Sequence, residues 1–171
     1  MINKKGDIWV SAVIYIALGI IILSIVLAVG IPTIQKMKDN HVAKQTKEIM
    51  FKIDENIRSV YNQGPGAQTQ LKIKVGKGDL TIEQNKIEWI MRTKALLSEP
   101  GATVTEGPMT IITTQSAQEG EYDISLMLDY SDQELELAFD ETQNPLRGTK
   151  LLTILNEGID GSATKIKISE L

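Results

Sequence analysis

The sequence predicts an α+β protein in which a long, partly transmembrane N-terminal helix precedes an antiparallel β-sandwich-like domain. Three observations lead to this fold class. Ile8–Gln35 is a run of 28 residues without a charged side chain. Residues 36–61 then place apolar side chains at helical spacing, and beyond Gly66 apolar and polar residues alternate with the period of two that is typical of strands. We therefore expect one helix over residues 7–61 and a β-rich domain over residues 67–171.

The apolar segment Ile8–Ile31 has the composition of a membrane helix. At about 1.5 Å per residue, its 24 residues span a hydrocarbon core of about 30 Å, and a helix pairs all of its own backbone groups in lipid. A core helix of a soluble protein is a poorer reading, because one small domain cannot surround such a segment on every side. A secretory signal peptide cut after Gly30 is also disfavoured, since the apolar region of such peptides is about 7–15 residues long.

Residues 36–61 form the amphipathic half of the predicted helix. Its apolar residues recur at spacings of seven, four, four and three, and they form one stripe: Val42, Ile49, Ile53, Ile57 and Val60. Asp54 and Arg58 are among the charged residues assigned to the other sides. We expect the core face of the β-domain to cover part of the stripe. His41, the one histidine, is read as an ordinary helix residue rather than a pH switch or a ligand.

The β-domain is predicted to contain eight short strands. Gly76–Gly78 is read as a tight turn between two of them. The clearest predicted hairpin joins Tyr122–Tyr130 to Leu135–Phe139 through a turn at Ser131–Gln133. The segment Leu96–Pro108 is expected to be irregular because Pro100-Gly101 and Gly107-Pro108 interrupt it.

Few residues are available for catalysis or metal binding. The chain has no cysteine and one histidine, so thiol nucleophiles and thiolate metal sites are excluded. Six acids within thirteen residues suggest calcium, but their spacing fits no EF-hand loop and a solvated hairpin face explains them better: Asp129, Asp132, Glu134, Glu136, Asp140 and Glu141. Residues 61–171 carry ten Lys/Arg against seventeen Asp/Glu, which disfavours nucleic-acid binding. We expect no enzymatic activity, cofactor or metal.

The N-terminus carries a short basic motif before the apolar helix. Lys4 and Lys5 are followed by Gly6 and Asp7, and this arrangement resembles the class III signal peptide of type IV pilins, especially archaeal pilins and archaellins. The resemblance implies that a prepilin peptidase removes a leader of residues 1–6 by cutting between Gly6 and Asp7 on the cytoplasmic side. Bacterial major pilins usually have Glu at the fifth mature position, where this chain has Ser11, so the archaeal branch fits better.

The resemblance implies a structural subunit of a type IV pilus-like surface filament for adhesion or motility. Residues 8–31 would contact membrane lipid before assembly and identical helices in the filament core, with the β-domain outside the cell. Ser24 and Ala28, four residues apart, could permit close helix contact. The alternative is a single-pass membrane-anchored surface binding domain that does not polymerise, and a secreted domain released at Gly30 is a third. The surface ligand stays open.

Lysines flank the apolar segment on both sides. Lys4 and Lys5 precede it, whereas four lysines follow within the next sixteen residues: Lys36, Lys38, Lys44 and Lys47. Counted alone, this distribution favours a cytoplasmic C-terminal domain. In the filament reading these lysines belong to a helix that packs against neighbours, and the outward orientation is preferred.

Overall fold

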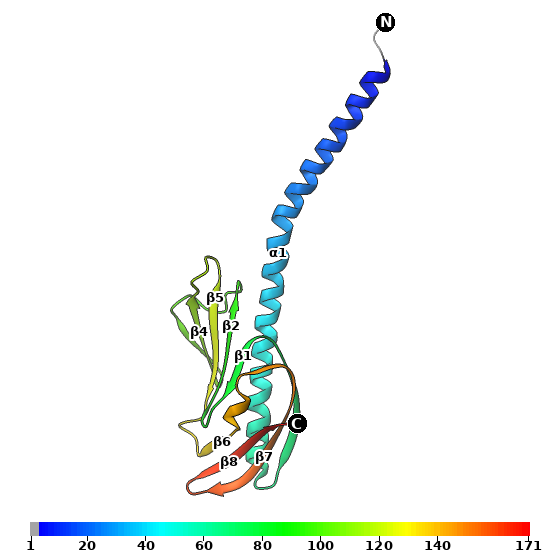
Figure 1. Cartoon of the computed structure of the whole chain (residues 1–171). Coiled ribbons are helices and arrows are strands. Elements are labelled where there is room, and N and C mark those ends of the chain that lie inside the picture. Colours follow the sequence, from blue (N-terminus) through cyan, green and yellow to red (C-terminus); the bar gives the residue numbers. More distant parts are fainter. Residues whose placement is uncertain (1–3) are drawn as a thin grey trace. The chain divides into compact units, whose positions relative to one another are not determined.

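The computed structural model describes residues 4–171, with side chains from Trp9 onward except that of Glu141. One helix, α1 (Lys4–Gln63), is followed by a sheet of eight strands (Figure 1). The chain divides into two compact units, one ending at Lys38 and the other comprising Asp39–Leu171. The predicted fold class is confirmed. The strands are β1 (Gln68–Ile82), β2 (Lys86–Thr93), β3 (Thr103–Glu106), β4 (Met109–Gln115), β5 (Tyr122–Asp129), β6 (Leu135–Ala138), β7 (Leu146–Asp160) and β8 (Ala163–Glu170), with a short 3-10 helix at Glu141–Gln143.

All eight strands belong to one hydrogen-bonded sheet, in the order β3-β4-β5-β2-β1-β7-β8-β6. The described ladders are antiparallel except that between β6 and β8, which is parallel. The sandwich-like domain is therefore built from one sheet and not from two separate ones. The segment predicted to be irregular contains the short edge strand β3, all four residues of which are exposed.

The prediction of a turn at Gly76–Gly78 is wrong, because this segment lies inside β1. The first part of β1 pairs with β7 and its last four residues pair with β2, with a register shift between Val75 and Leu80. The strand is thus irregular at the glycines and gains β2 as a second neighbour beyond them, while Leu80 pairs again with Leu146 of β7, and the chain does not reverse. Period-two alternation cannot distinguish these outcomes, since both interrupt the ladder in the same way.

Contacts around Gly78 hold the bend in β1. Gly78 has a φ of 84°, and a Cβ built on it would lie 2.1 Å from the carbonyl oxygen of Ile90. The buried Trp89 donates its indole N–H to the carbonyl oxygen of Lys77 at 2.9 Å. The bend therefore packs directly against β2.

The predicted hairpin of β5 and β6 is also wrong. The chain turns after β5, but β5 pairs with β2 along one edge and with β4 along the other. No edge of β5 is left for β6, which instead lies parallel to β8. On its other side the N–H of Leu137 in β6 donates to the carbonyl oxygen of Gln84, at 2.6 Å.

Residues 39–63 of α1 pack on the buried face of the sheet, as predicted. Ile53, Ile57 and Val60 of the stripe are buried together with residues from seven strands, whereas Val42 and Ile49 are only half-buried. The covered face is centred further round the helix, and it also includes Ala43, Thr46, Met50 and Asp54.

Candidate functional site

The first unit exposes a continuous apolar surface. From Trp9 to Met37, the exposed large apolar side chains range from 49% accessible at Leu27 to 76% at Trp9. The helix is long and apolar enough to cross a membrane, judged by its length and composition. An apolar surface of this extent is unfavourable in water. It therefore needs lipid or other apolar side chains around it.

Two hydroxyl groups on this part of the helix bond to the helix itself. Ser24 donates to the carbonyl oxygen of Ile20 at 2.7 Å, and Thr33 donates to that of Val29 at 2.8 Å. Pro32 lies inside the helix and has no N–H, so the carbonyl of Ala28 loses its ordinary helical donor. Apart from that carbonyl and the exposed Tyr15 side chain, the surface offers mainly apolar contact.

The residues predicted for cleavage and packing fall on α1. The backbone of Lys4, Lys5, Gly6 and Asp7 is helical, but their side chains and the whole of Met1–Asn3 lie outside the described part of the structure. Cleavage after Gly6 therefore stays a prediction. Ser24 and Ala28 are exposed and, four residues apart, share one face of the helix. Their packing against another helix also stays a prediction.

The second unit contains a charged cluster around the buried Asp54 that hydrophobic periodicity did not indicate. Asp54 is 6% exposed, although the sequence pattern placed it on a solvent side. Arg58 donates its Nε–H toward both carboxylate oxygens of Asp54, at 2.9 and 2.8 Å, and the hydroxyl of Tyr130 donates to Oδ1 at 3.0 Å. Arg58 also lies over the Tyr130 ring, 6.0 Å from its centre. Asp54 and Arg58 are four residues apart, but nothing local in the sequence indicates Tyr130.

This cluster anchors the end of β5 to the helix. Burial raises the pKa of Tyr130, and the negative charge of Asp54 raises it further. The phenol therefore stays protonated at neutral pH and acts as a hydrogen-bond donor. The guanidinium of Arg58 keeps its charge as well, because its hydrogen bond with Asp54 raises its pKa. Its role is structural, since each polar group here satisfies another.

Asp39 and Asn156 hold the two ends of the packed helical segment. Asp39 accepts from the backbone N–H of Lys94 at 2.8 Å and from the Lys77 ammonium at 2.9 Å. Burial would raise the pKa of Asp39, but these hydrogen bonds lower it below its ordinary value. At the other end, buried Asn156 donates to the carbonyl oxygens of Val60 and Tyr61, at 3.2 and 3.5 Å. These side chains satisfy backbone groups that a helix end or a strand end leaves free.

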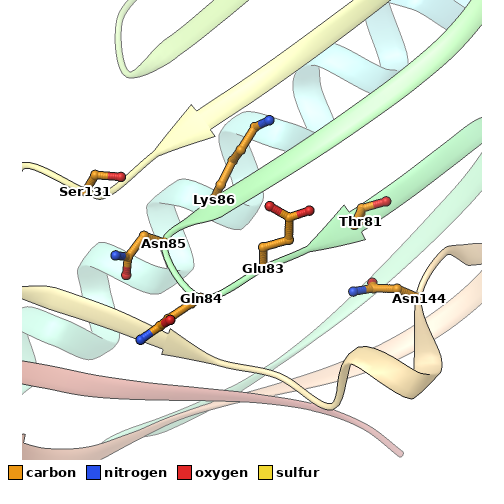
Figure 2. A pocket seen from close by; sticks show the side chains of 7 residues that line it. All are labelled: Thr81, Glu83, Gln84, Asn85, Lys86, Ser131 and Asn144. Atoms are coloured by element: carbon orange, nitrogen blue, oxygen red, sulfur yellow. The ribbon is translucent and has the colours of Figure 1, made fainter.

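A polar cavity of about 650 Å³ lies beside the β1–β2 connection (Figure 2). Most of its hydrogen-bonding groups are engaged in holding the fold. The side chain of Asn144 accepts from the N–H of Ile82 at 3.1 Å and donates to its carbonyl oxygen at 2.7 Å. Asn85 Oδ1 is buried without a protein donor among the described residues. The cavity is lined by Thr81, Glu83, Gln84, Asn85, Lys86, Ser131 and Asn144.

The acidic residues near this cavity do not converge. Asp129 accepts from Ser131, Asp140 accepts from Thr142, and Glu136 accepts from Gln84. Among the side chains that the structure describes, no group of three His, Cys, Asp or Glu residues could hold a metal ion. The arrangement at this end of the sheet is that of loop-stabilising Asx turns.

Comparison of the chain with protein-family models, with curated proteins and with solved structures finds no match.

Proposed function

We propose that this chain is a structural subunit of a type IV pilus-like surface filament. The observation that carries the proposal is the uncovered apolar surface from Trp9 to Met37, next in sequence to a helical segment that has its own packed sheet. A plain anchor needs only lipid around the first segment. A filament subunit exchanges that lipid for identical helices, while its folded unit supplies the outer surface.

The N-terminal motif supports this choice over a plain anchor. Lys4 and Lys5 before Gly6 and Asp7 place a basic leader immediately ahead of the apolar helix. Removal of residues 1–6 by a prepilin peptidase would leave that helix whole on the mature protein. The folded unit would then be extracellular and have no catalytic role, and filaments would serve adhesion or motility.

The decisive test is the composition of sheared surface filaments. We expect them to contain this protein with Asp7 as its first residue, as shown by N-terminal sequencing. A membrane-bound protein that retains Met1 and is absent from filaments would instead support the anchored surface domain. A first residue at Ile31 would show release from the membrane and refute both readings.

A packing variant tests the role of the helix surface. Lipid tails are as apolar as leucine, so helices exchange lipid for each other through shape complementarity, and small residues permit close approach. Ala28→Phe should therefore reduce the amount of filament while membrane-bound protein stays constant. Leu27→Phe is the control, because it places the same ring where a large side chain already stands. If both variants form as much filament as the parent protein, Ala28 is not at a close helix contact.

A further inference from the structure

The second unit has a groove between α1 and β1 that the sheet leaves open. It measures about 500 Å³. Val42 and Ile49, the two stripe residues that remain half-exposed, contribute apolar surface to it. The full lining is Val42, Gln45, Thr46, Glu48, Ile49, Lys52, Lys74 and Gly76.

Two lysines line the groove, Lys52 and Lys74. Both are exposed, and neither forms an ion pair with the side chains that the structure describes. Glu48 is the one acid in the lining. The groove therefore has a positive rim over a partly apolar floor.

The turn after β5 carries negative charge, in contrast to the lysines of the groove. Asp132 and Glu134 are exposed and form no ion pair within the described part of the chain, while Asp129 is held by Ser131. This acidic turn (residues 131–134) is fixed against α1, because Arg58 donates to the side chain of Gln133 at 3.4 Å. The neighbouring Tyr130–Asp54 hydrogen bond holds it on the same flank.

The groove and the acidic turn lie on opposite flanks of the same helix. At about 100° per residue, Arg58 is about 160° round the axis from Val42, and Asp54 is about 140° round from Ile49. Complementary surfaces on opposite flanks cannot meet within one chain. A contact between the two surfaces on neighbouring copies would be heterologous, and such a contact repeats into a ring or a helical filament.

We propose that the groove bordered by Lys52 and Lys74 receives the acidic turn of a second copy, with its Asp132 and Glu134. The inference rests on the proposed filament and names the contact between its outer domains. Half-exposed Val42 and Ile49 become covered, and the unpaired lysines gain carboxylate partners. Because the pairs are near the surface, salt should weaken this contact.

Cysteine cross-linking in full-length protein tests the contact directly, since the chain has no cysteine of its own. A chain that carries both Lys74→Cys and Glu134→Cys should give a ladder of disulfide-linked oligomers when sheared filaments are oxidised, and reductant should collapse it. Disulfides require Cα atoms within about 7 Å, so the ladder reports specific proximity. The control pairs Lys74→Cys with Glu119→Cys, an exposed acid in the loop before β5, and should give no ladder.

Charge reversal provides a second measurement that does not depend on disulfide geometry. Lys52→Glu combined with Lys74→Glu should lower the amount of filament severalfold, and adding Asp132→Lys with Glu134→Lys should restore it. Filaments that show no ladder and tolerate the reversal would overturn this contact and leave the proposed function standing. Absence of the parent protein from filaments would refute the proposed function and this inference with it.

Discussion

The bend in β1 allows a quantitative test, because three nearby glycines differ in what an added methyl group would meet. Gly78 has a φ of 84° and its Cβ would lie 2.1 Å from the Ile90 carbonyl oxygen. Gly148 of β7, which pairs with Val75 of β1, has a φ of 76°, but a Cβ added to it would meet no atom within 4 Å. Gly76 has open space and no positive φ.

The three alanine variants should therefore lose stability in order. Gly148→Ala carries only the cost of a left-handed backbone, about 1–2 kcal/mol. Gly78→Ala carries that cost plus displacement of the β2 backbone, which adds about 1–3 kcal/mol, so the total is about 2–5 kcal/mol. Gly76→Ala should change the free energy of unfolding by no more than about 0.5 kcal/mol.

Trp89 is a suitable probe of this loss. It is fully buried, and its indole N–H binds the carbonyl of Lys77 at the bend. In full-length protein in detergent, Trp9→Phe leaves it as the only tryptophan, since the chain has two. Urea unfolding followed by Trp89 fluorescence gives the midpoint. An unchanged slope of the unfolding free energy against urea concentration would show that stability alone has changed. A Gly78→Ala variant as stable as Gly148→Ala would refute the contact between the bend and β2.

Two further predictions concern the side chains that hold the two ends of the packed segment of α1. Asn156→Ala should lower the free energy of unfolding by about 1–3 kcal/mol, since it leaves buried backbone groups unpaired. Asn156→Asp should lower it further, because a carboxylate would face carbonyl oxygens at a helix C-terminus. Urea midpoints measure both losses, and variants as stable as the parent would contradict the capping role of Asn156. The pKa of Asp39 is lowered by its hydrogen bonds from Lys94 and Lys77, so its stabilising effect is complete above the ordinary value of 3.8 and is lost as the pH falls through the lower pKa of the folded state. Asp39→Asn should therefore reduce the fall in urea midpoint between about pH 6 and pH 3, and an unchanged profile would refute this role.

The fold class was predictable because it depends on features that each segment carries alone. A long uncharged run, a helical period and a period of two appear in order along the chain, and the structure has a helix followed by a sheet. The strand partners were not predictable in the same way. Alternation shows which face of a strand is buried, but it does not show which edge pairs with which neighbour. That is why the β5–β6 hairpin and the turn in β1 were wrong, although most strand segments were found; the short edge strand β3 was missed because it lies in the segment expected to be irregular.

In the candidate site, too, features carried by one segment were predictable and contacts between distant residues were not. Exposure of the segment from Trp9 to Met37 agrees with its composition, because a long uncharged run is typical of a helix that is surrounded by lipid. The Asp54 cluster and the Asn156 cap were missed because their partners are 76 and 96 residues away. The lysines of the groove were visible in the sequence as charged residues, but only the structure shows that they form no ion pair with the described side chains.

In both halves of α1 some polar side chains bond to the helix itself, but only the second half also has polar partners from the sheet domain, and this difference limits what can bind each half. Between Asp39 and Gln63 the sheet supplies donors and acceptors, so a carboxylate such as Asp54 can be buried beside Tyr130. Before Lys38, Ser24 and Thr33 donate back to their own helix. A partner for the first half must therefore match its shape with apolar groups, whereas a partner for the second half can also use charge. Loss of filaments through Ala28→Phe should accordingly be insensitive to salt, and loss through reversal of Lys52 and Lys74 should depend on it.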